Sequence, residues 1–173
     1  TETARDLAKA VSADRSAAIG AVSLAETLRQ ELDAARTAHQ DASITVATDI
    51  PNVNVRGDKM LTSVFRNLLT NAVQHNDSET PAVTVSVETT EDEARVRITD
   101  DGPGIPDDQK ETVFDHGAKG DDSGGTGLGL YLVSVLVDQY GGSVDVGDNN
   151  PRGTVFTVTL PLAADQPSHD WLS

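Results

Sequence analysis

A set of closely spaced glycines directly before an apolar helical run is the feature that most restricts how this chain folds. The run reads Ser123-Gly124-Gly125-Thr126-Gly127-Leu128-Gly129-Leu130 and continues as an apolar pattern to Tyr140. Glycines let the backbone approach a ligand without a Cβ in the way, and the first N–H groups of a helix point at an anion. The run predicts a phosphate-binding loop before a helix, although a tight turn or close helix packing would give the same pattern.

Other phosphate-binding patterns are absent from the chain. It has no G-x-x-x-x-G-K-[ST] pattern, and no G-x-G-x-x-G pattern between a first strand and helix. A P-loop and a dinucleotide-binding fold are therefore disfavoured, and the glycine run needs support from other motifs.

Length and composition favour one domain with a hydrophobic core. The chain has 173 residues, of which 37% are hydrophobic, and this is too short for two domains of comfortable size. It contains no cysteine, which excludes disulfides, thiolate metal sites and cysteine catalysis. Neither a signal peptide nor a long apolar run is present, so we expect a cytoplasmic location, with any membrane anchor elsewhere in a full-length protein.

The chain is strongly acidic. Its formal net charge is −15, with twenty Asp, eight Glu and only four Lys. Such a surface repels nucleic acid and anionic lipid, so we expect no nucleic-acid partner. Asp enrichment with Lys depletion resembles proteins adapted to high salt, where screening weakens repulsion between surface carboxylates. A halophilic origin is therefore a hypothesis.

Apolar periodicity predicts helices and strands along most of the chain. Ser23 and Glu26 form a capping box at the start of one helix, and Asp58 can cap a second. Strands are indicated where Val and Ile alternate with polar residues. The expected helices cover about 23–40, 58–76 and 126–140, and the expected strands lie around 44–46, 53–55, 83–87, 95–99, 144–146 and 155–160.

The remaining segments have weaker patterns. We expect residues 1–22 to be the end of an upstream helical region with a linker, 23–162 to form the domain, and 163–173 to be a loose tail. Residues 106–125 are polar and largely without period. A loop of this length in a small domain is usually functional, so we expect a lid over a ligand.

Two asparagines stand at helical spacing in the second expected helix. Asn67 and Asn71 are four residues apart and emerge on the same face, beside the apolar stripe. Amide oxygens there suit Mg²⁺ bound to a nucleotide, because this ion needs only one or two protein oxygens besides the phosphates. Two asparagines that bond to the local backbone near a helix end would give the same pattern.

A second polar motif, Asp100-Asp101-Gly102-Pro103-Gly104-Ile105, directly follows an expected strand. A carboxylate at a strand end can accept a hydrogen bond from an exocyclic amine, while glycines let a flat base lie against the backbone. The site would select adenine over guanine, because guanine presents a carbonyl where adenine presents an amine. An ordinary turn after a strand would have the same composition.

These motifs, in this order, resemble the catalytic ATP-binding domain of sensor histidine kinases, in the GHKL superfamily shared with type II topoisomerase, mismatch-repair and chaperone ATPases. The resemblance covers roughly residues 23–162. It implies an α/β two-layer sandwich of the Bergerat type, with a mixed, mainly antiparallel sheet, three helices on one face and an ATP lid. The matched motifs are the N box Asn67–Asn76, the G1 box Asp100–Ile105, a degenerate F box Val113-Phe114 with Lys119, the G2 box Gly125–Leu130 and the closing Gly153-Thr154-Val155-Phe156.

The resemblance also implies a role for each matched residue. Asn71 would be the magnesium ligand, with Asn67 as a second polar contact and Lys119 near the terminal phosphate. Asp100 would hold the adenine amino group. His75 stands where the family often has an aromatic ring beside the base, and a solvated histidine at a helix end fits equally well. The other residues expected to bind the nucleotide are Gly102, Gly104, Ile105, Gly125, Thr126, Gly127, Leu128, Gly129 and Thr154.

Two departures from the family pattern affect the expected activity. Gly117 stands where the F box usually has a second Phe, which implies looser lid packing. None of the four histidines, His39, His75, His116 and His169, resembles the phosphoacceptor motif, a histidine followed by an acidic residue. We therefore expect the chain to bind ATP and Mg²⁺ and to donate the γ-phosphoryl to a histidine on a dimerisation domain of the full-length protein, with weak activity alone.

The expected partners are ATP, that dimerisation domain and a downstream response regulator, and we expect the isolated domain to be monomeric. Alternatives are a nucleotide-binding regulatory module without kinase activity, an anti-sigma-type serine kinase and an energy-coupling ATPase. By family resemblance, the Gly-Leu-Gly-Leu form of the G2 box disfavours the serine kinase. The absence of Glu from the N-box helix disfavours the energy-coupling ATPase.

Overall fold

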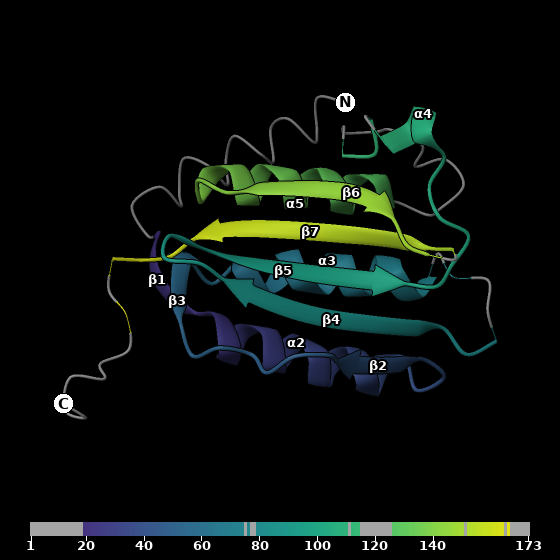
Figure 1. Cartoon of the computed structure of the whole chain (residues 1–173), viewed down its shortest axis with the longest axis horizontal. Helices are drawn as coiled ribbons and strands as arrows, with labels where there is room; N and C mark the ends of the chain where they lie inside the picture. The colour runs from purple at the N-terminus through teal and green to yellow at the C-terminus, as the bar shows by residue number, and fades with distance from the viewer. Residues whose placement is uncertain are drawn as a thin grey trace.

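Three helices cover one face of a five-stranded sheet (Figure 1). The structure is a computed structural model that describes residues 19–74, 76, 79–110, 112–114, 126–150, 152–164 and 166. It confirms the expected α/β two-layer sandwich with a mixed, mainly antiparallel sheet. The elements are β1 Gly20–Ser23, α2 Leu24–Ala38, β2 Ser43–Val46, β3 Asn54–Gly57, α3 Leu61–Gln74, β4 Ala82–Thr89, β5 Glu93–Asp100, α4 Asp107–Lys110, α5 Thr126–Gln139, β6 Ser143–Asp148 and β7 Thr154–Pro161.

The order of the large sheet is β2-β4-β5-β7-β6. β2 runs parallel to β4, and the other neighbours are antiparallel. Alternate residues of the central strands are buried, because one face of the sheet packs on the helices while the other meets solvent. The core therefore lies between the sheet and the three helices, and its sheet side is formed by Val83, Val85, Val87, Val96, Ile98, Phe156, Val158 and Leu160.

Helix α2 begins at the predicted capping box. The Oγ of Ser23 accepts a hydrogen bond from the N–H of Glu26 at 3.2 Å. Farther along α2, the buried carboxylate of Glu31 pairs with Arg66 of α3, with 3.0 Å between Nε and Oε1. This pair joins the polar edges of α2 and α3, while the apolar stripe of α2 packs into the core through Leu24, Leu28 and Leu32.

Asp58 connects the start of α3 with the end of α5. Its Oδ1 accepts a hydrogen bond from the N–H of Met60 at 2.9 Å and another from the hydroxyl of Tyr140 at 2.7 Å. Both Asp58 and Tyr140 are buried. Helix α3 begins at Leu61, three residues later than the sequence predicts, so Asp58 stabilises the turn before the helix and not its first turn.

The shorter strands belong to two different sheets. β1 pairs antiparallel with β3 in a separate two-stranded sheet, and β2 joins β4. The sequence does not predict β1, because its four residues are too few to show the alternation that identifies a strand. The short helix α4 also falls in a segment expected to be a loop.

Contacts continue beyond β7. Ala163 is buried and donates its N–H to the carbonyl of Asn54 at 2.9 Å. The side-chain amide of Gln166 bonds to the N–H and the carbonyl of Asn54, at 2.9 and 2.7 Å. Ala163 and Gln166 thus attach the chain after β7 to β3. No helix among the described residues is long and apolar enough to cross a membrane.

Candidate functional site

The motifs predicted to carry chemistry meet at one end of the sheet. β5 ends there at Asp100 and β7 begins there at Thr154, because Thr99 and Val155 are paired neighbours. The end of α3 and the start of α5 lie at the same end, on the right in Figure 1. Segments far apart in the sequence are therefore close enough to form one site.

Asp100 is a buried carboxylate with a fixed position. The residue is 7% exposed, and its Oδ1 accepts N–H bonds from Gly102 at 2.9 Å and Thr154 at 3.2 Å. The close approach of β7 requires Gly153, which has φ of 118°, because a Cβ at this position would lie 1.9 Å from the carbonyl oxygen of Asp100. The predicted G1 box and the closing Gly-Thr-x-Phe motif are thus in direct contact.

The two asparagines of α3 have different surroundings. Asn67 donates through Nδ2 to the carbonyl of Ser63 at 2.7 Å, which is the local backbone bond that the sequence left open as an alternative. Asn71 is 7% exposed, and the structure shows no hydrogen bond of its amide within the described part of the chain. No side-chain nitrogen or oxygen among the described residues is both fully buried and without a hydrogen-bond partner. The polar atoms of the Asn71 amide are therefore in contact with solvent. Asn71 is available to an external ligand.

Asp101 connects the end of α3 with the G1 box. Asn76 donates through Nδ2 to its Oδ1 at 2.6 Å, and the N–H of Ala82 donates to the same oxygen at 3.1 Å. The hydrogen bond from Asn76 is the main reason that the pKa of Asp101 lies below its ordinary value. The sequence motif contains Asp101, but its spacing alone does not show that this residue has a structural partner.

The segment after the G1 box is anchored to β6 and β7. Lys110 of α4 pairs with Asp148 at the end of β6, with 2.8 Å between Nζ and Oδ1, and also with Asp107. The ring of Phe114, in the predicted F box, meets the ring of Phe156 edge to face, with centroids 5.9 Å apart. These contacts place the beginning of the expected lid beside the end of the sheet.

Other predicted site residues are only partly covered by the structure. Gly102 is buried, Gly104 has φ of 85°, and half-buried Ile105 packs against the core. His75, Lys119 and Gly125 lie outside the described residues. Thr126, Gly127 and Leu128 form the start of α5, which is described for its backbone alone.

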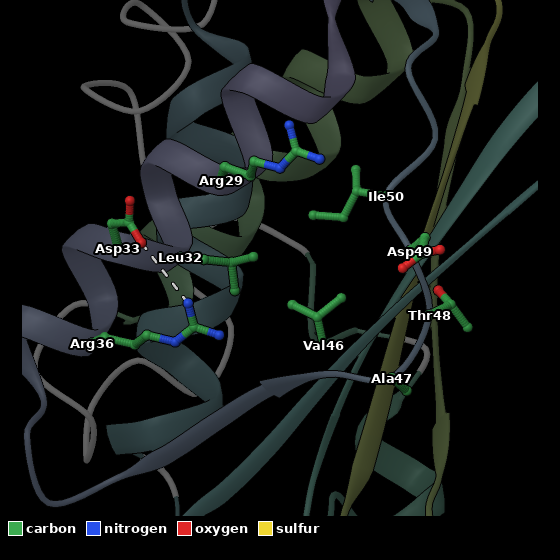
Figure 2. A pocket seen from close by; sticks show the side chains of 9 residues that line it. All are labelled: Arg29, Leu32, Asp33, Arg36, Val46, Ala47, Thr48, Asp49 and Ile50. Carbon is green, nitrogen blue, oxygen red and sulfur yellow. Dashed lines mark ion pairs between the residues drawn. The ribbon is translucent and has the colours of Figure 1, made fainter.

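A separate pocket of about 450 Å³ lies between α2 and the residues after β2 (Figure 2). Arg29 and Arg36 extend toward it from α2, and Asp49 lies on the opposite wall. Arg36 donates through Nε to the carbonyl of Ile44 at 3.1 Å and lies 3.8 Å from Asp33. The formal charges of its lining residues cancel, and none of the predicted site residues line it.

Comparison with known proteins gives consistent matches. A family model described as histidine kinase-, DNA gyrase B- and HSP90-like ATPase matches residues 57–164. Sensor-like histidine kinase SenX3 of Mycolicibacterium smegmatis is 28% identical over 171 residues, which make up 95% of this chain and 44% of SenX3. The chain spans less than half the length of the curated relatives that it matches.

Solved structures share the fold. The mycobacterial sensor histidine kinase MprB has a TM-score of 0.74 at 28% identity, with 83% of this chain and 98% of that chain covered. Full-length ShkA in complex with AMPPNP has a TM-score of 0.72 at 27% identity, with 86% of this chain and 32% of that chain covered. The similarity to MprB therefore extends over nearly the whole of the solved MprB chain.

Proposed function

Since this chain belongs to the histidine kinase-, DNA gyrase B- and HSP90-like ATPases, we propose that it donates the γ-phosphoryl of magnesium-bound ATP to a histidine. Its relatives are sensor histidine kinases, and its structural neighbours are kinase catalytic domains. The acceptor histidine that we propose lies on a dimerisation domain of the full-length protein, and a response regulator receives the phosphoryl group next. The buried Asp100 carboxylate at the end of β5 is the observation that carries this proposal.

Adenine recognition is assigned to Asp100. Its carboxylate is held through Oδ1 by two backbone N–H groups, so its direction is set before a ligand arrives. Such a carboxylate accepts a hydrogen bond from the amino group of adenine. It cannot bond to the carbonyl oxygen of guanine, because both groups are acceptors. Gly102, Gly104, Ile105 and Thr154 would surround the base. Support for an adenine nucleotide comes from ShkA, which was solved with the ATP analogue AMPPNP.

Asn71 is the residue that we propose holds Mg²⁺. Its amide suits this ion, because it supplies a neutral oxygen at the surface of the site and has no hydrogen bond within the described part of the chain. An Mg²⁺ ion held there would supply positive charge that neutralises the phosphates during transfer. Within the described residues no group of three or more acidic or histidine side chains could hold a metal alone. Phosphate oxygens and water would therefore complete the coordination.

Phosphoryl transfer is mostly a matter of positioning and charge neutralisation. We propose that the backbone N–H groups of the G2 box, at Gly125, Thr126, Gly127, Leu128 and Gly129, bind the phosphates. Lys119 would stabilise charge at the terminal phosphate, and Asn67 would be a second polar group between the phosphates and α5. His75 is proposed beside the base. The acceptor histidine comes from another domain, so the chain alone would turn over ATP slowly.

Nucleotide binding is tested by calorimetry with Mg²⁺ and high salt. ATP and ADP should bind and GTP much less, and Asp100→Asn should abolish this preference. Asp108→Asn is a matched control, because it removes the same charge at an exposed position of nearby α4 and should leave the preference intact. Equal binding of ATP and GTP by the wild-type chain would contradict the assignment of Asp100.

Phosphoryl transfer is tested by mixing the chain with labelled ATP and a helical dimerisation domain from a sensor kinase. An acid-labile phosphohistidine on that domain is the expected product. An acid-stable phosphoserine would favour a serine kinase. Intact ATP binding without any transfer to matched acceptor domains would favour a regulatory module.

A further inference from the structure

The turn between β6 and β7 holds the backbone of the G1 box from outside. Asn149 donates through Nδ2 to the carbonyl oxygen of Asp100 at 3.0 Å. Arg152 donates through Nε to the carbonyl oxygen of Gly102 at 2.9 Å. The carbonyls of Asp100 and Gly102, on either side of Asp101, are therefore both held by side chains of one short turn.

The backbone of this turn makes the two side-chain contacts possible. Gly153 approaches Asp100 so closely that a Cβ would lie 1.9 Å from the Asp100 carbonyl oxygen. The N–H of Asn149 bonds to the carbonyl of Gly153 at 3.0 Å and closes the turn. Because the turn lies directly against the end of β5, the short side chain of Asn149 reaches the Asp100 carbonyl.

We propose that Asn149 and Arg152 are positioning residues that set the base specificity of this site. The inference rests on the proposed function, because it takes Asp100 as the group that recognises adenine. The direction of the Asp100 carboxylate depends on the backbone from Asp100 to Gly102, which both donors hold. A hydrogen bond weakens steeply when its atoms are misaligned, so small movement of this backbone removes part of the preference for adenine.

The test compares ATP with inosine triphosphate, which carries a carbonyl where adenine carries its amine. Asn149→Ala and Arg152→Leu should each lower ATP affinity by about fivefold and leave inosine triphosphate affinity within about twofold. Arg152→Lys retains a donor and should recover part of the ATP affinity. Asn150→Ala is the matched control, because Asn150 is an exposed residue of the same turn and should leave both affinities unchanged.

The possible outcomes separate this inference from the proposed function. If the wild type prefers ATP and the Asn149 and Arg152 variants keep that preference, the positioning role is wrong and the adenine site stands. An equal loss of affinity for both nucleotides, with lowered thermal stability, would likewise show a purely structural role. If the wild type binds both nucleotides equally and Asp100→Asn changes nothing, the adenine site fails, and this inference fails with it. Asn149 and Arg152 are substituted in separate variants. If one variant fails to fold, the other still allows ATP and inosine triphosphate affinities to be compared with those of the wild type.

Discussion

Gly129 of α5 lies against the side chain of Asn67 of α3, where a Cβ on Gly129 would come within 2.6 Å of the Asn67 Oδ1. The Asn67 amide is held in turn by its bond to the carbonyl of Ser63 at 2.7 Å. A side chain at position 129 would therefore collide with this amide where α5 packs on α3. Close helix packing therefore explains why residue 129 is a glycine. For the glycine run as a whole, phosphate binding remains our proposal.

A Gly129→Ala substitution is predicted to change stability little and nucleotide affinity more. The added methyl would displace the Asn67 amide from Ser63, and a lost hydrogen bond costs about 1 kcal/mol. Ala in place of Gly stabilises a helix interior by about 1 kcal/mol, so the two effects nearly cancel in the free energy of unfolding measured with urea. ATP affinity, measured by calorimetry with Mg²⁺, should fall by about fivefold because the start of α5 and Asn67 both move.

The control for this substitution is Gly147→Ala, since a Cβ at Gly147 would meet nothing within 4 Å. Its ATP affinity should equal that of the wild type. Wild-type ATP affinity in the Gly129→Ala variant would show that the contact between α3 and α5 does not shape the nucleotide site.

The buried bond between Tyr140 and Asp58 is predicted to stabilise the packing of α5 on α3. Tyr140→Phe keeps the ring and removes the donor to Oδ1 of Asp58, which is 2.7 Å away. The free energy of unfolding should fall by about 1 to 2 kcal/mol in urea titrations. Asp58→Ala should cost more, because it also removes the acceptor for the N–H of Met60. Equal stability of wild type and Tyr140→Phe would show that this hydrogen bond has no net effect.

The elements that sequence predicts well have signals contained within a few residues. Ser23 caps α2 as expected, and the alternation from Val83 to Val87 corresponds to β4. The partner of a four-residue strand depends on tertiary packing, so the parallel pairing of β2 with β4 and the pairing of β1 with β3 could not be predicted locally. The buried bond of Tyr140 to Asp58 joins residues 82 positions apart and has no sequence signature.

The candidate site shows the same division. The placement of Asp100 at a strand end could be predicted, because its strand, its glycines and its carboxylate are adjacent in sequence. Asn149 and Arg152 are 49 and 50 residues away in sequence from the G1-box residues that they contact, and their partners are backbone carbonyls, which every residue has. Asn, Pro and Gly are ordinary turn residues, so the sequence of the β6–β7 turn gives no sign of these contacts.

The hydrogen bond between Asn76 and Asp101 is predicted to make the free energy of unfolding depend on pH in the acid range. Asn76 donates to the carboxylate at 2.6 Å, and this bond, followed by that from Ala82, lowers the pKa of Asp101 below its ordinary 3.8. A pKa lowered by folding means that the stabilisation is fully present above the ordinary value and is lost as the pH falls through the lowered pKa. Urea titrations should therefore show Asn76→Ala less stable than wild type at about pH 6, and the difference should shrink in acid.

The exposed Asn52 offers the control for this pH series. Asn52→Ala should follow the wild-type curve throughout. A stability difference between Asn76→Ala and wild type that stays constant into the acid range would assign the effect of Asn76 to packing and not to the ionised carboxylate.

Salt is predicted to stabilise the fold, because the formal net charge of −15 produces repulsion across the surface. Salt also weakens exposed ion pairs such as Arg97 with Glu88, but each such pair contributes only about 0 to 1 kcal/mol. The Debye length falls from about 10 Å at 0.1 M to about 3 Å at 1 M, so screening of the larger repulsion should dominate. The midpoint of thermal unfolding should rise steeply toward molar KCl, and less steeply in a variant with Asp33→Asn and Asp108→Asn, since both carboxylates are exposed. A midpoint that is flat or falls with KCl would remove the hypothesis of adaptation to high salt.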